Sequence, residues 1–151
     1  MVRRYDYRFD LTTDTFRSGL SVEVAPPGGN CFGVRCGVDE LDDVTWNGAP
    51  AEKSVIASGT LQVCGGDVSA PGPLQIEAAG ALEPATFLGL DVGFSRSTDM
   101  AGGEFTYLLS WVGGCDHFGP CDDAPSRLSE FHFEVTHPPG ANVLCPGVLQ
   151  P

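Results

Sequence analysis

The residues best suited to chemistry gather in one stretch, residues 113–125 of the 151-residue chain. This stretch holds two of the six cysteines, one of the three histidines and a pair of adjacent aspartates, and no apolar period runs through it. Thiolates and imidazole are good zinc ligands, a thiol beside a histidine can act as a nucleophile, and paired carboxylates can share a proton. Residues 131–135 then alternate apolar and polar, which is typical of a half-buried strand. The stretch is therefore either a site or a structural corner before a strand.

A metal site in this chain would use Cys115, His117 and Cys121, together with Cys31 and Cys36. The spacings are C-x5-C and C-x4-C, which differ from the tight C-x2-C pairs that mark zinc sites strongly. The same cysteines are even in number and permit disulfides, with Cys31–Cys36 and Cys115–Cys121 as the local pairs. Free buried thiols are the third alternative. The sequence leaves the pairing open, and we predict no metal ligand set.

Two catalytic interpretations have less support. Asp122 and Asp123 are adjacent in an extended loop and point to opposite sides, so they are more typical of turn residues that bond backbone N–H groups. Cys121 with His117 has no identifiable orienting group or oxyanion donor. Arg127 is expected to pair with an aspartate of the loop. We therefore predict no catalytic residue in this chain.

The charge balance argues against several classes of partner. Lys and Arg total 8 against 20 Asp and Glu, which gives a net charge of −12. A surface of that sign repels phosphate backbones and anionic lipid. No apolar run approaches the roughly 20 residues that cross a bilayer, and no apolar stretch of a secretory signal follows the basic start. We expect no nucleic-acid or membrane partner, and a cytoplasmic location.

Alternation of apolar and polar residues predicts strands along most of the chain. Residues 5–11 and 20–24 alternate strictly on either side of a turn cluster, which indicates an antiparallel hairpin. Residues 41–46 read as a strand that ends at Asn47 and Gly48, a favoured pair for a type I′ turn. Further strands are expected at 55–56, 60–63 and 74–78.

The second half of the chain adds an aromatic strand. Residues 105–111 are rich in aromatic and aliphatic side chains, which predicts a buried strand. No window of 11 or more residues carries a helical stripe, and Gly and Pro recur at intervals of about ten residues. The predicted fold class is all-β, an antiparallel β-sandwich or saddle-like twisted sheets with little or no helix, in a single domain of residues 1–151.

Residues 120–125, P-C-D-D-A-P, resemble a segment of the aminopeptidase N family of zinc metallopeptidases. That family carries an F-P-C-x-D-E-P box and then a strand that ends in V-P-x-G, as residues 131–140 do here with H-P-P-G. Cys121, Asp123 and Pro125 stand at the matching places, where the resemblance implies a structural corner.

The sequence departs from the family's box at two positions. Ala124 replaces the Glu of the box, and Gly119 replaces its Phe.

The resemblance implies an N-terminal β domain packed beside a zinc peptidase domain. The zinc motif H-E-x-x-H and the G-A-M-E-N loop of the family do not occur in this sequence, so the zinc is expected in the parent enzyme and no cofactor in this chain. The family places a substrate-facing Gln about a dozen residues before the box Cys. Leu109, Ser110 and Trp111 stand there instead, which makes Ser110 a candidate hydrogen-bonding group and Trp111 a candidate apolar wall for substrate. Core packing of Trp111 is the alternative.

The function expected from these residues is therefore a supporting one. The chain would be the non-catalytic N-terminal domain of a protein similar to a zinc-dependent aminopeptidase. It would support a downstream catalytic peptidase domain, its partner, and shape the access of peptide substrate. An independent β-sandwich binding module and a small structural zinc-binding domain are the alternatives.

Overall fold

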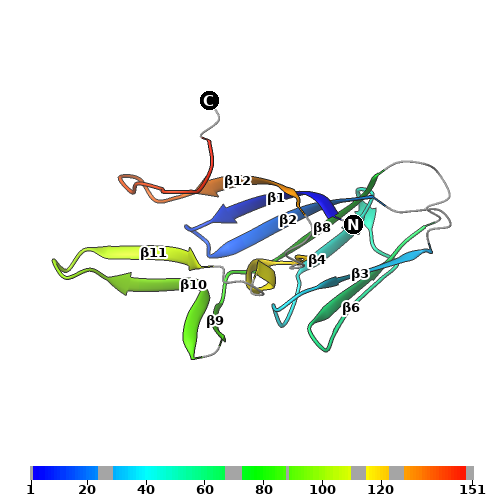
Figure 1. Ribbon diagram of the computed structural model, residues 1–151, viewed down its shortest axis with the longest axis horizontal. Helices are drawn as coiled ribbons and strands as arrows, with labels where there is room; N and C mark the ends of the chain where they lie inside the picture. Colours follow the sequence, from blue (N-terminus) through cyan, green and yellow to red (C-terminus); the bar gives the residue numbers. More distant parts are fainter. Residues whose placement is uncertain are drawn as a thin grey trace.

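Three β-sheets make up the fold in the computed structural model of the protein (Figure 1). The largest has the strand order β12-β1-β2-β8-β4-β5, and the two three-stranded sheets have the orders β11-β10-β9 and β3-β7-β6. The structure describes residues 2–23, 29–66, 73–87, 89–109, 115–122 and 128–148. The predicted all-β class is confirmed, and the one helical element within those residues is the 3-10 turn η1 (Cys115–Phe118).

The strand bounds follow the predicted alternation within a few residues for eight of the described strands, while β3, β5, β9 and β10 were not predicted as strands. They are β1 (Val2–Asp10), β2 (Thr15–Glu23), β3 (Cys31–Arg35), β4 (Asp43–Trp46), β5 (Ala49–Pro50), β6 (Lys53–Ala57), β7 (Thr60–Cys64), β8 (Pro73–Ala81), β9 (Pro84–Phe87), β10 (Leu90–Thr98), β11 (Glu104–Leu109) and β12 (Glu130–Thr136).

The first two strands form the antiparallel hairpin that the sequence predicts. Tyr5 lies opposite Leu20, and Phe9 lies opposite Phe16. Tyr5, Tyr7 and Phe9 are all buried, because side chains two residues apart on a strand share one face. The hairpin of β1 and β2 therefore contributes the aromatic side chains against which the rest of the core packs.

Two type I′ turns set the registers of the short strands. Asn47 and Gly48 have φ angles of 50° and 78°, which confirms the turn predicted between β4 and β5. Ser58 and Gly59 repeat the pattern, with φ of 51° and 70°, between β6 and β7. The right-handed twist of the flanking strands favours this turn type.

Strand β12 confirms the strand predicted at residues 131–135, but it runs parallel to β1, in the one parallel pair among the described residues. Phe131 lies opposite Tyr5, and Phe133 lies opposite Tyr7. Since β12 is the edge strand, Phe131 and Phe133 remain 48% and 40% exposed.

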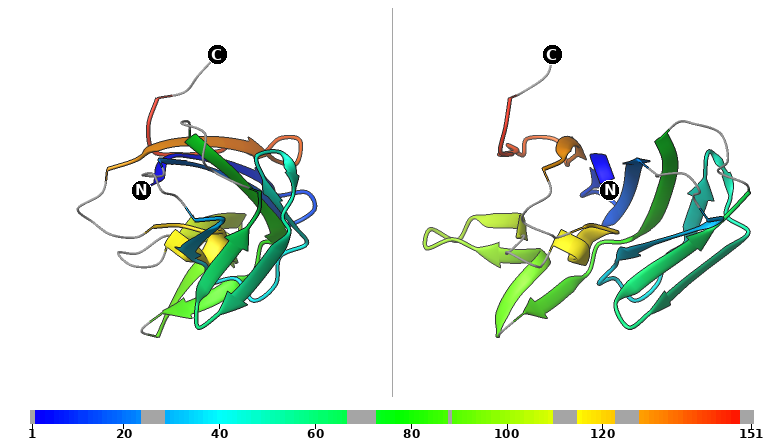
Figure 2. Two further views of the ribbon diagram at one scale, coloured as in Figure 1. Left: turned by 90° about the vertical axis from the view of Figure 1, so that its right-hand side faces the viewer. Right: turned by 45° about the vertical axis from the view of Figure 1, so that its right-hand side comes forward.

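The core is centred on stacked aromatic rings beneath the large sheet. The rings of Tyr5 and Phe131 stack with centroids 4.9 Å apart, and Tyr7 stacks on Phe9 and on Phe133. Phe118 of η1 packs edge-on against the rings of Tyr7 and Phe9. Figure 2 shows η1, in yellow, inside the curve of the six-stranded sheet.

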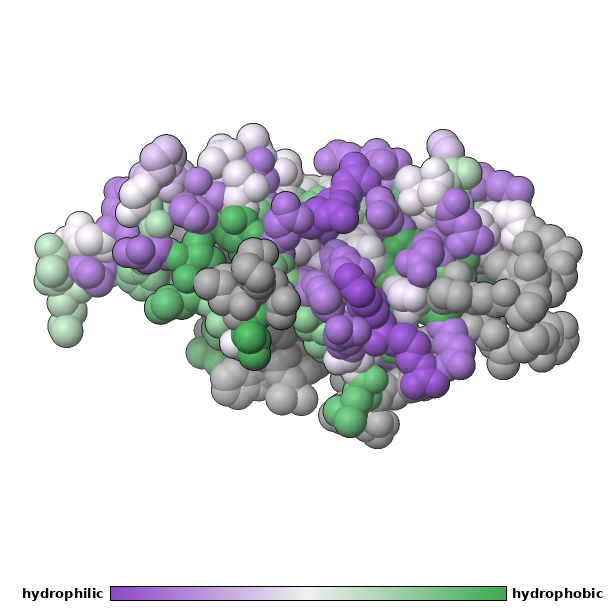
Figure 3. Space-filling view, turned by 90° about the horizontal axis from the view of Figure 1, so that it is seen from above, coloured by the Kyte–Doolittle hydropathy of each residue, from purple (hydrophilic) through white to green (hydrophobic). Residues whose placement is uncertain are grey.

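The opposite face of the large sheet is polar. Ion pairs join Arg4 to Asp6, Arg8 to Glu134, and Arg17 to both Asp43 and Glu77, and Arg3 also contacts Glu23. Figure 3 shows hydrophilic side chains gathered over the middle of this side. This face of the six-stranded sheet is therefore compatible with exposure to solvent.

The prediction of a buried strand at residues 105–111 is wrong in its burial. Strand β11 covers Glu104–Leu109, with Phe105 47% and Leu109 39% exposed. The hairpin of β10 and β11 projects past the ends of β1 and β2, so one of its faces has no neighbouring layer among the described residues (Figure 1). In the described part of the chain, no helix is long and apolar enough to cross a membrane.

Candidate functional site

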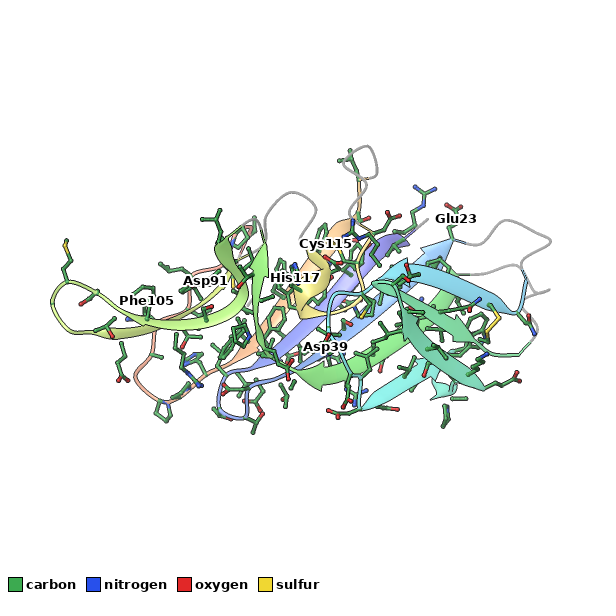
Figure 4. All side chains as sticks on the ribbon, turned by 90° about the horizontal axis from the view of Figure 1, so that it is seen from below. Glu23, Asp39, Asp91, Phe105, Cys115 and His117 are labelled. Atoms are coloured by element: carbon green, nitrogen blue, oxygen red, sulfur yellow. A yellow bond between two sulfur atoms is a disulfide. The ribbon has the colours of Figure 1, made fainter. Side chains whose placement is uncertain are left out.

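The stretch richest in reactive residue types folds into a disulfide-closed corner, residues 115–122. Cys115 opens the turn η1 and Cys121 follows three residues after its end, and their sulfur atoms are bonded. Figure 4 shows Cys115 and His117 on η1, at the centre of the side opposite the polar sheet face. A disulfide at a separation of six residues closes a small ring, so it fixes the corner locally.

Two backbone hydrogen bonds dock the corner on the end of β3. The Cys121 N–H donates to the Arg35 carbonyl over 2.9 Å, and the Gly37 N–H donates to the Asp116 carbonyl over 2.9 Å. These bonds lie on either side of Cys36, whose thiol is free and buried. The corner therefore continues the sheet edge as an isolated antiparallel bridge.

The two disulfides answer the question that the sequence left open. Of the two local pairs, Cys115–Cys121 forms and Cys31–Cys36 does not. Cys31 bonds instead to Cys64, its register partner across β3 and β7. Residues an odd number of positions apart on a strand point to opposite faces, so Cys36 turns inward while Cys31 stays at the surface.

Aromatic side chains of β1 pack against the corner and hydrogen-bond to it. Phe118 meets the ring of Tyr7 edge-on at 5.9 Å and that of Phe9 at 6.0 Å. The Tyr5 hydroxyl accepts a hydrogen bond of 2.8 Å from the Asp122 N–H. The alternation of β1 predicted these rings to be buried, but their contacts with a loop 109 to 117 residues further along the chain have no signal in the sequence.

Gly119 makes the tight passage between η1 and Cys121 possible. Its φ is +130°, and a Cβ atom there would lie 3.0 Å from both the Phe16 ring and the Ser18 hydroxyl. This is the position at which the resembled box carries Phe. Because Phe118, one residue earlier, fills the aromatic layer, a second bulky side chain has no space.

Burial favours the protonated forms of two groups beside the corner, the Cys36 thiol and the Tyr7 phenol. Burial raises the pKa of the Cys36 thiol to about 11, with a smaller contribution from the Asp116 carboxylate. Burial is also the main reason that the pKa of Tyr7 is raised, and Tyr5, Asp116 and Cys36 add to it. A thiol with a raised pKa is a poor nucleophile at neutral pH.

Asp116 and His117 are the least satisfied polar groups of the corner. The Asp116 side chain is 5% exposed, and one of its oxygens lies 3.4 Å from an Arg35 guanidinium nitrogen. Among the residues that the structure describes, its other oxygen and the Nδ1 atom of His117 have no hydrogen-bond partner. A Cβ at Gly37 would lie 3.0 Å from that Nδ1 atom, so the corner packs closely against the chain just after β3.

The residues of the corner do not fit zinc. A cysteine binds zinc as a thiolate, and the sulfurs of Cys115, Cys121 and Cys31 are all in disulfides. Within the described residues, no group of three or more His, Cys, Asp or Glu is arranged to hold a metal ion. The same disulfide excludes the alternative of Cys121 as a nucleophile with His117.

The other predicted site residues lie outside the described part of the chain. These are Ser110 and Trp111, proposed for substrate, Asp123 and Pro125 of the corner, and Arg127. Described residues flank them, with Leu109 ending β11 and Cys115 opening η1. Their roles stay predictions.

Comparison with known proteins gives a likeness in fold. No family model and no curated protein matches the chain. The crystal structure of an M1 zinc metallopeptidase from Deinococcus radiodurans matches with a TM-score of 0.64 and 21% identity, over 89% of this chain and 31% of that chain. A two-domain M1 zinc metallopeptidase variant bound to L-tryptophan matches with a TM-score of 0.62 and 22% identity, over 89% of this chain and 32% of that chain.

A third structure of the same kind, a Deinococcus radiodurans variant bound to a Tyr-Ser-Ala substrate, has a TM-score of 0.59 and 20% identity, over 89% of this chain and 31% of that one. The chain therefore spans about a third of the length of the structures it matches. At this identity the likeness is one of fold, and at that level it confirms the resemblance to zinc metallopeptidases seen in residues 120–140.

Proposed function

We propose that this chain is the non-catalytic N-terminal β domain of a protein similar to a zinc-dependent aminopeptidase. There it supports the catalytic domain and shapes the access of peptides to it. The observation that carries the proposal is the coverage of the structural matches: 89% of this chain corresponds to only 31% of an M1 zinc metallopeptidase. A fold that fills one third of such enzymes leaves the rest of the polypeptide for the peptidase chemistry.

The chemistry of the corner supports a structural role. Four of the six cysteines are in disulfides, the buried Cys36 thiol stays protonated at neutral pH, and the Asp116 carboxylate faces Arg35. A corner of this kind fixes the path of the chain between β11 and β12. Zinc bound in the catalytic domain would activate a water for attack on the peptide bond. The residues of this chain would not touch that water.

Peptide access is assigned to Ser110 and Trp111, the two residues that follow the end of β11 in the sequence. A hydroxyl and an indole there would offer one hydrogen bond and one apolar wall to a peptide backbone and side chain.

The test compares two proteins on chromogenic amino-acid amides. The chain alone is expected to show no turnover, with or without added zinc, and the full-length polypeptide that contains it is expected to be active and to lose activity on chelation. Zinc-dependent turnover by the chain alone would overturn the non-catalytic assignment. A full-length polypeptide with no zinc peptidase activity would favour the independent binding module, and near-stoichiometric zinc in the chain alone would favour the structural zinc domain.

The compartment we propose differs from the cytoplasmic one expected from the sequence. Disulfides persist in oxidising compartments and are rare where glutathione and thioredoxin keep thiols reduced. Cys31–Cys64 joins two strands of one sheet and Cys115–Cys121 closes the corner, so both have structural positions. We therefore place the maturation of the chain in an oxidising compartment. Alkylation of the native protein, isolated from its own cells under denaturing conditions without reductant, is expected to label only Cys36 and Cys145.

A further inference from the structure

Strand β12 forms one edge of the six-stranded sheet, and no strand pairs with its outer side among the described residues. Phe131 and Phe133 share one face of this strand and remain exposed, although they lie beside the buried rings of β1. Glu130, His132 and Glu134 alternate with them on the opposite, polar face. An edge strand presents backbone N–H and C=O groups for pairing. The edge of β12 therefore combines these groups with an exposed apolar row.

Three other edge strands carry residues that hinder pairing with another chain. Pro50 lies in β5, Pro84 lies in β9, and Lys53, the only lysine of the chain, lies in β6. A proline removes a backbone donor, and a lysine on an edge opposes the approach of a second strand. The sequence of β12, E-F-H-F-E-V-T, holds neither residue type. This edge is therefore open to a partner strand in a way that the other three are not.

A hollow of about 840 Å³ lies beside β12. Residues 130–135 line one side of it together with three residues of β1, and residues 143–148 line another. The chain turns back after β12 and then leads away from the sheet (Figures 1 and 2). Because neighbouring strands need a spacing of only about 4.8 Å, the hollow leaves space for the backbone of a second strand along β12.

We propose that this edge joins two copies of the chain, whose β12 strands pair antiparallel about a two-fold axis at Phe133. A two-fold axis makes the pairing of an edge strand with its own copy antiparallel and places one residue opposite itself. With Phe133 at the axis, all seven residues of β12 are paired, from Glu130 opposite Thr136 of the second copy onward. The two six-stranded sheets then form one continuous sheet. The association does not depend on the proposed function.

The charges of β12 favour this register over its neighbours. With Phe133 at the axis, His132 lies opposite Glu134 of the second copy, so no like charges face each other. With His132 at the axis, Glu130 would face Glu134 of the second copy on both sides of the axis. With Glu134 at the axis, that carboxylate would face its own copy. Like charges directly opposite each other destabilise a strand pair, so both of these registers are disfavoured.

The apolar row of β12 favours the same register. Phe133 then faces its own copy, and Phe131 faces Val135 of the second copy, which gives aromatic and β-branched cross-strand pairs. An axis at Phe131 or Val135 would pair only residues 130–132 or 134–136 of each strand. The exposed parts of Phe131 and Phe133 become covered in the dimer, which removes apolar surface from water.

Sedimentation velocity on the Cys145→Ser protein tests the association. Cys145 is exposed and free, so its substitution removes chance disulfides between molecules. We expect a reversible dimer at about 100 μM, because a single strand pair makes a small interface. A monomer at that concentration would overturn the proposal and would leave the proposed function untouched.

Matched substitutions test the surface. Phe133→Lys places two like charges at the axis and should weaken the dimer at least about tenfold. Leu90→Lys makes the same change of charge at an exposed position of β10 and should leave the dissociation constant unchanged. A dimer that survives Phe133→Lys uses another surface. Equal weakening by both substitutions would be an effect of net charge alone, and either result would overturn the proposal.

Cross-linking tests the register, again in the Cys145→Ser background. In the proposed dimer the two copies of residue 133 have Cα atoms about 4.5–5.5 Å apart, within reach of a disulfide. The two copies of residue 131 are offset by four residues, or about 14 Å along the strands. Under mild oxidation we expect Phe133→Cys to form a covalent dimer at least about tenfold faster than Phe131→Cys. Equal rates for the two variants would refute the strand pair centred on Phe133.

Discussion

Removal of the Cys31–Cys64 disulfide tests how this domain is held together. We expect Cys31→Ala/Cys64→Ala to lower the free energy of unfolding by about 3.7 kcal/mol, because the bond closes a loop with a sequence separation of 33. The loss follows from the entropy that the unfolded chain regains, about 2.1 + 1.5R ln n in cal/mol/K, which for this loop is roughly 12.5 cal/mol/K at 25 °C.

Removal of the corner disulfide is the matched comparison. Cys115→Ala/Cys121→Ala opens a loop with a separation of only six, so the same relation gives about 2.2 kcal/mol. The corner also keeps its two backbone bonds to β3 and the packing of Phe118, which do not depend on the disulfide. We therefore expect the shorter bridge to matter less by about 1.5 kcal/mol.

The assay is urea unfolding at neutral pH, followed by tryptophan fluorescence and by circular dichroism. If fluorescence and circular dichroism give the same transition, a two-state free energy of unfolding can be fitted. A changed dependence of that free energy on urea concentration would indicate a more expanded unfolded state. Reduced wild-type protein should match the variant that lacks both bonds. If the corner variant loses more stability than the Cys31–Cys64 variant, the reasoning from loop entropy is refuted, and strain or lost contacts in the folded corner dominate.

Three other substitutions probe the corner and its support. Gly119→Ala should cost at least about 2 kcal/mol in urea unfolding, since its positive φ and its close neighbours both disfavour a Cβ, whereas Gly66→Ala, in open space, is the neutral control. Tyr5→Phe should cost about 1–2 kcal/mol in the same assay, because it leaves a partly buried backbone N–H without its acceptor, and a cost no greater than that of Tyr107→Phe would contradict the anchoring role. The raised pKa of Cys36, about 11 against an ordinary 9.0, means that the folded state holds the thiol proton more tightly, so stability is full below pH 9 and falls as the pH rises towards 11. Across that pH interval, the free energy of unfolding should fall less steeply with pH for Cys36→Ala than for the wild type. Identical slopes for the two proteins would exclude the thiol as the cause.

The predictions from sequence that succeeded concern local patterns. The hairpin of β1 and β2, the type I′ turn at Asn47 and Gly48, and the strand β12 all follow from alternation and turn chemistry within a few residues. The burial predicted for β11 failed, because burial depends on whether another layer covers the strand. Composition gives a strand's tendency to be buried, but not what covers it.

The candidate site shows the same division. Residue types and spacing drew attention to the corner, and they left its cysteines open between metal, disulfide and free thiol. Tertiary structure placed Cys64 opposite Cys31, a residue that spacing along the chain had not brought into consideration. It also showed that the Tyr5 hydroxyl holds the corner at Asp122. Both facts depend on contacts between residues far apart in the sequence.

The sequence alone therefore determined the all-β class, because the faces of a strand are set by a period of two residues, and it determined the acidic surface. By resemblance it also predicts a structural corner at residues 120–125, of which 123–125 lie outside the described residues. Only the tertiary structure decided which cysteines pair, why residue 119 is Gly, and which apolar strand is left uncovered. Each of these depends on the position of one element against another, and the packing of Phe118 on β1 fixes the corner only once the sheet has formed.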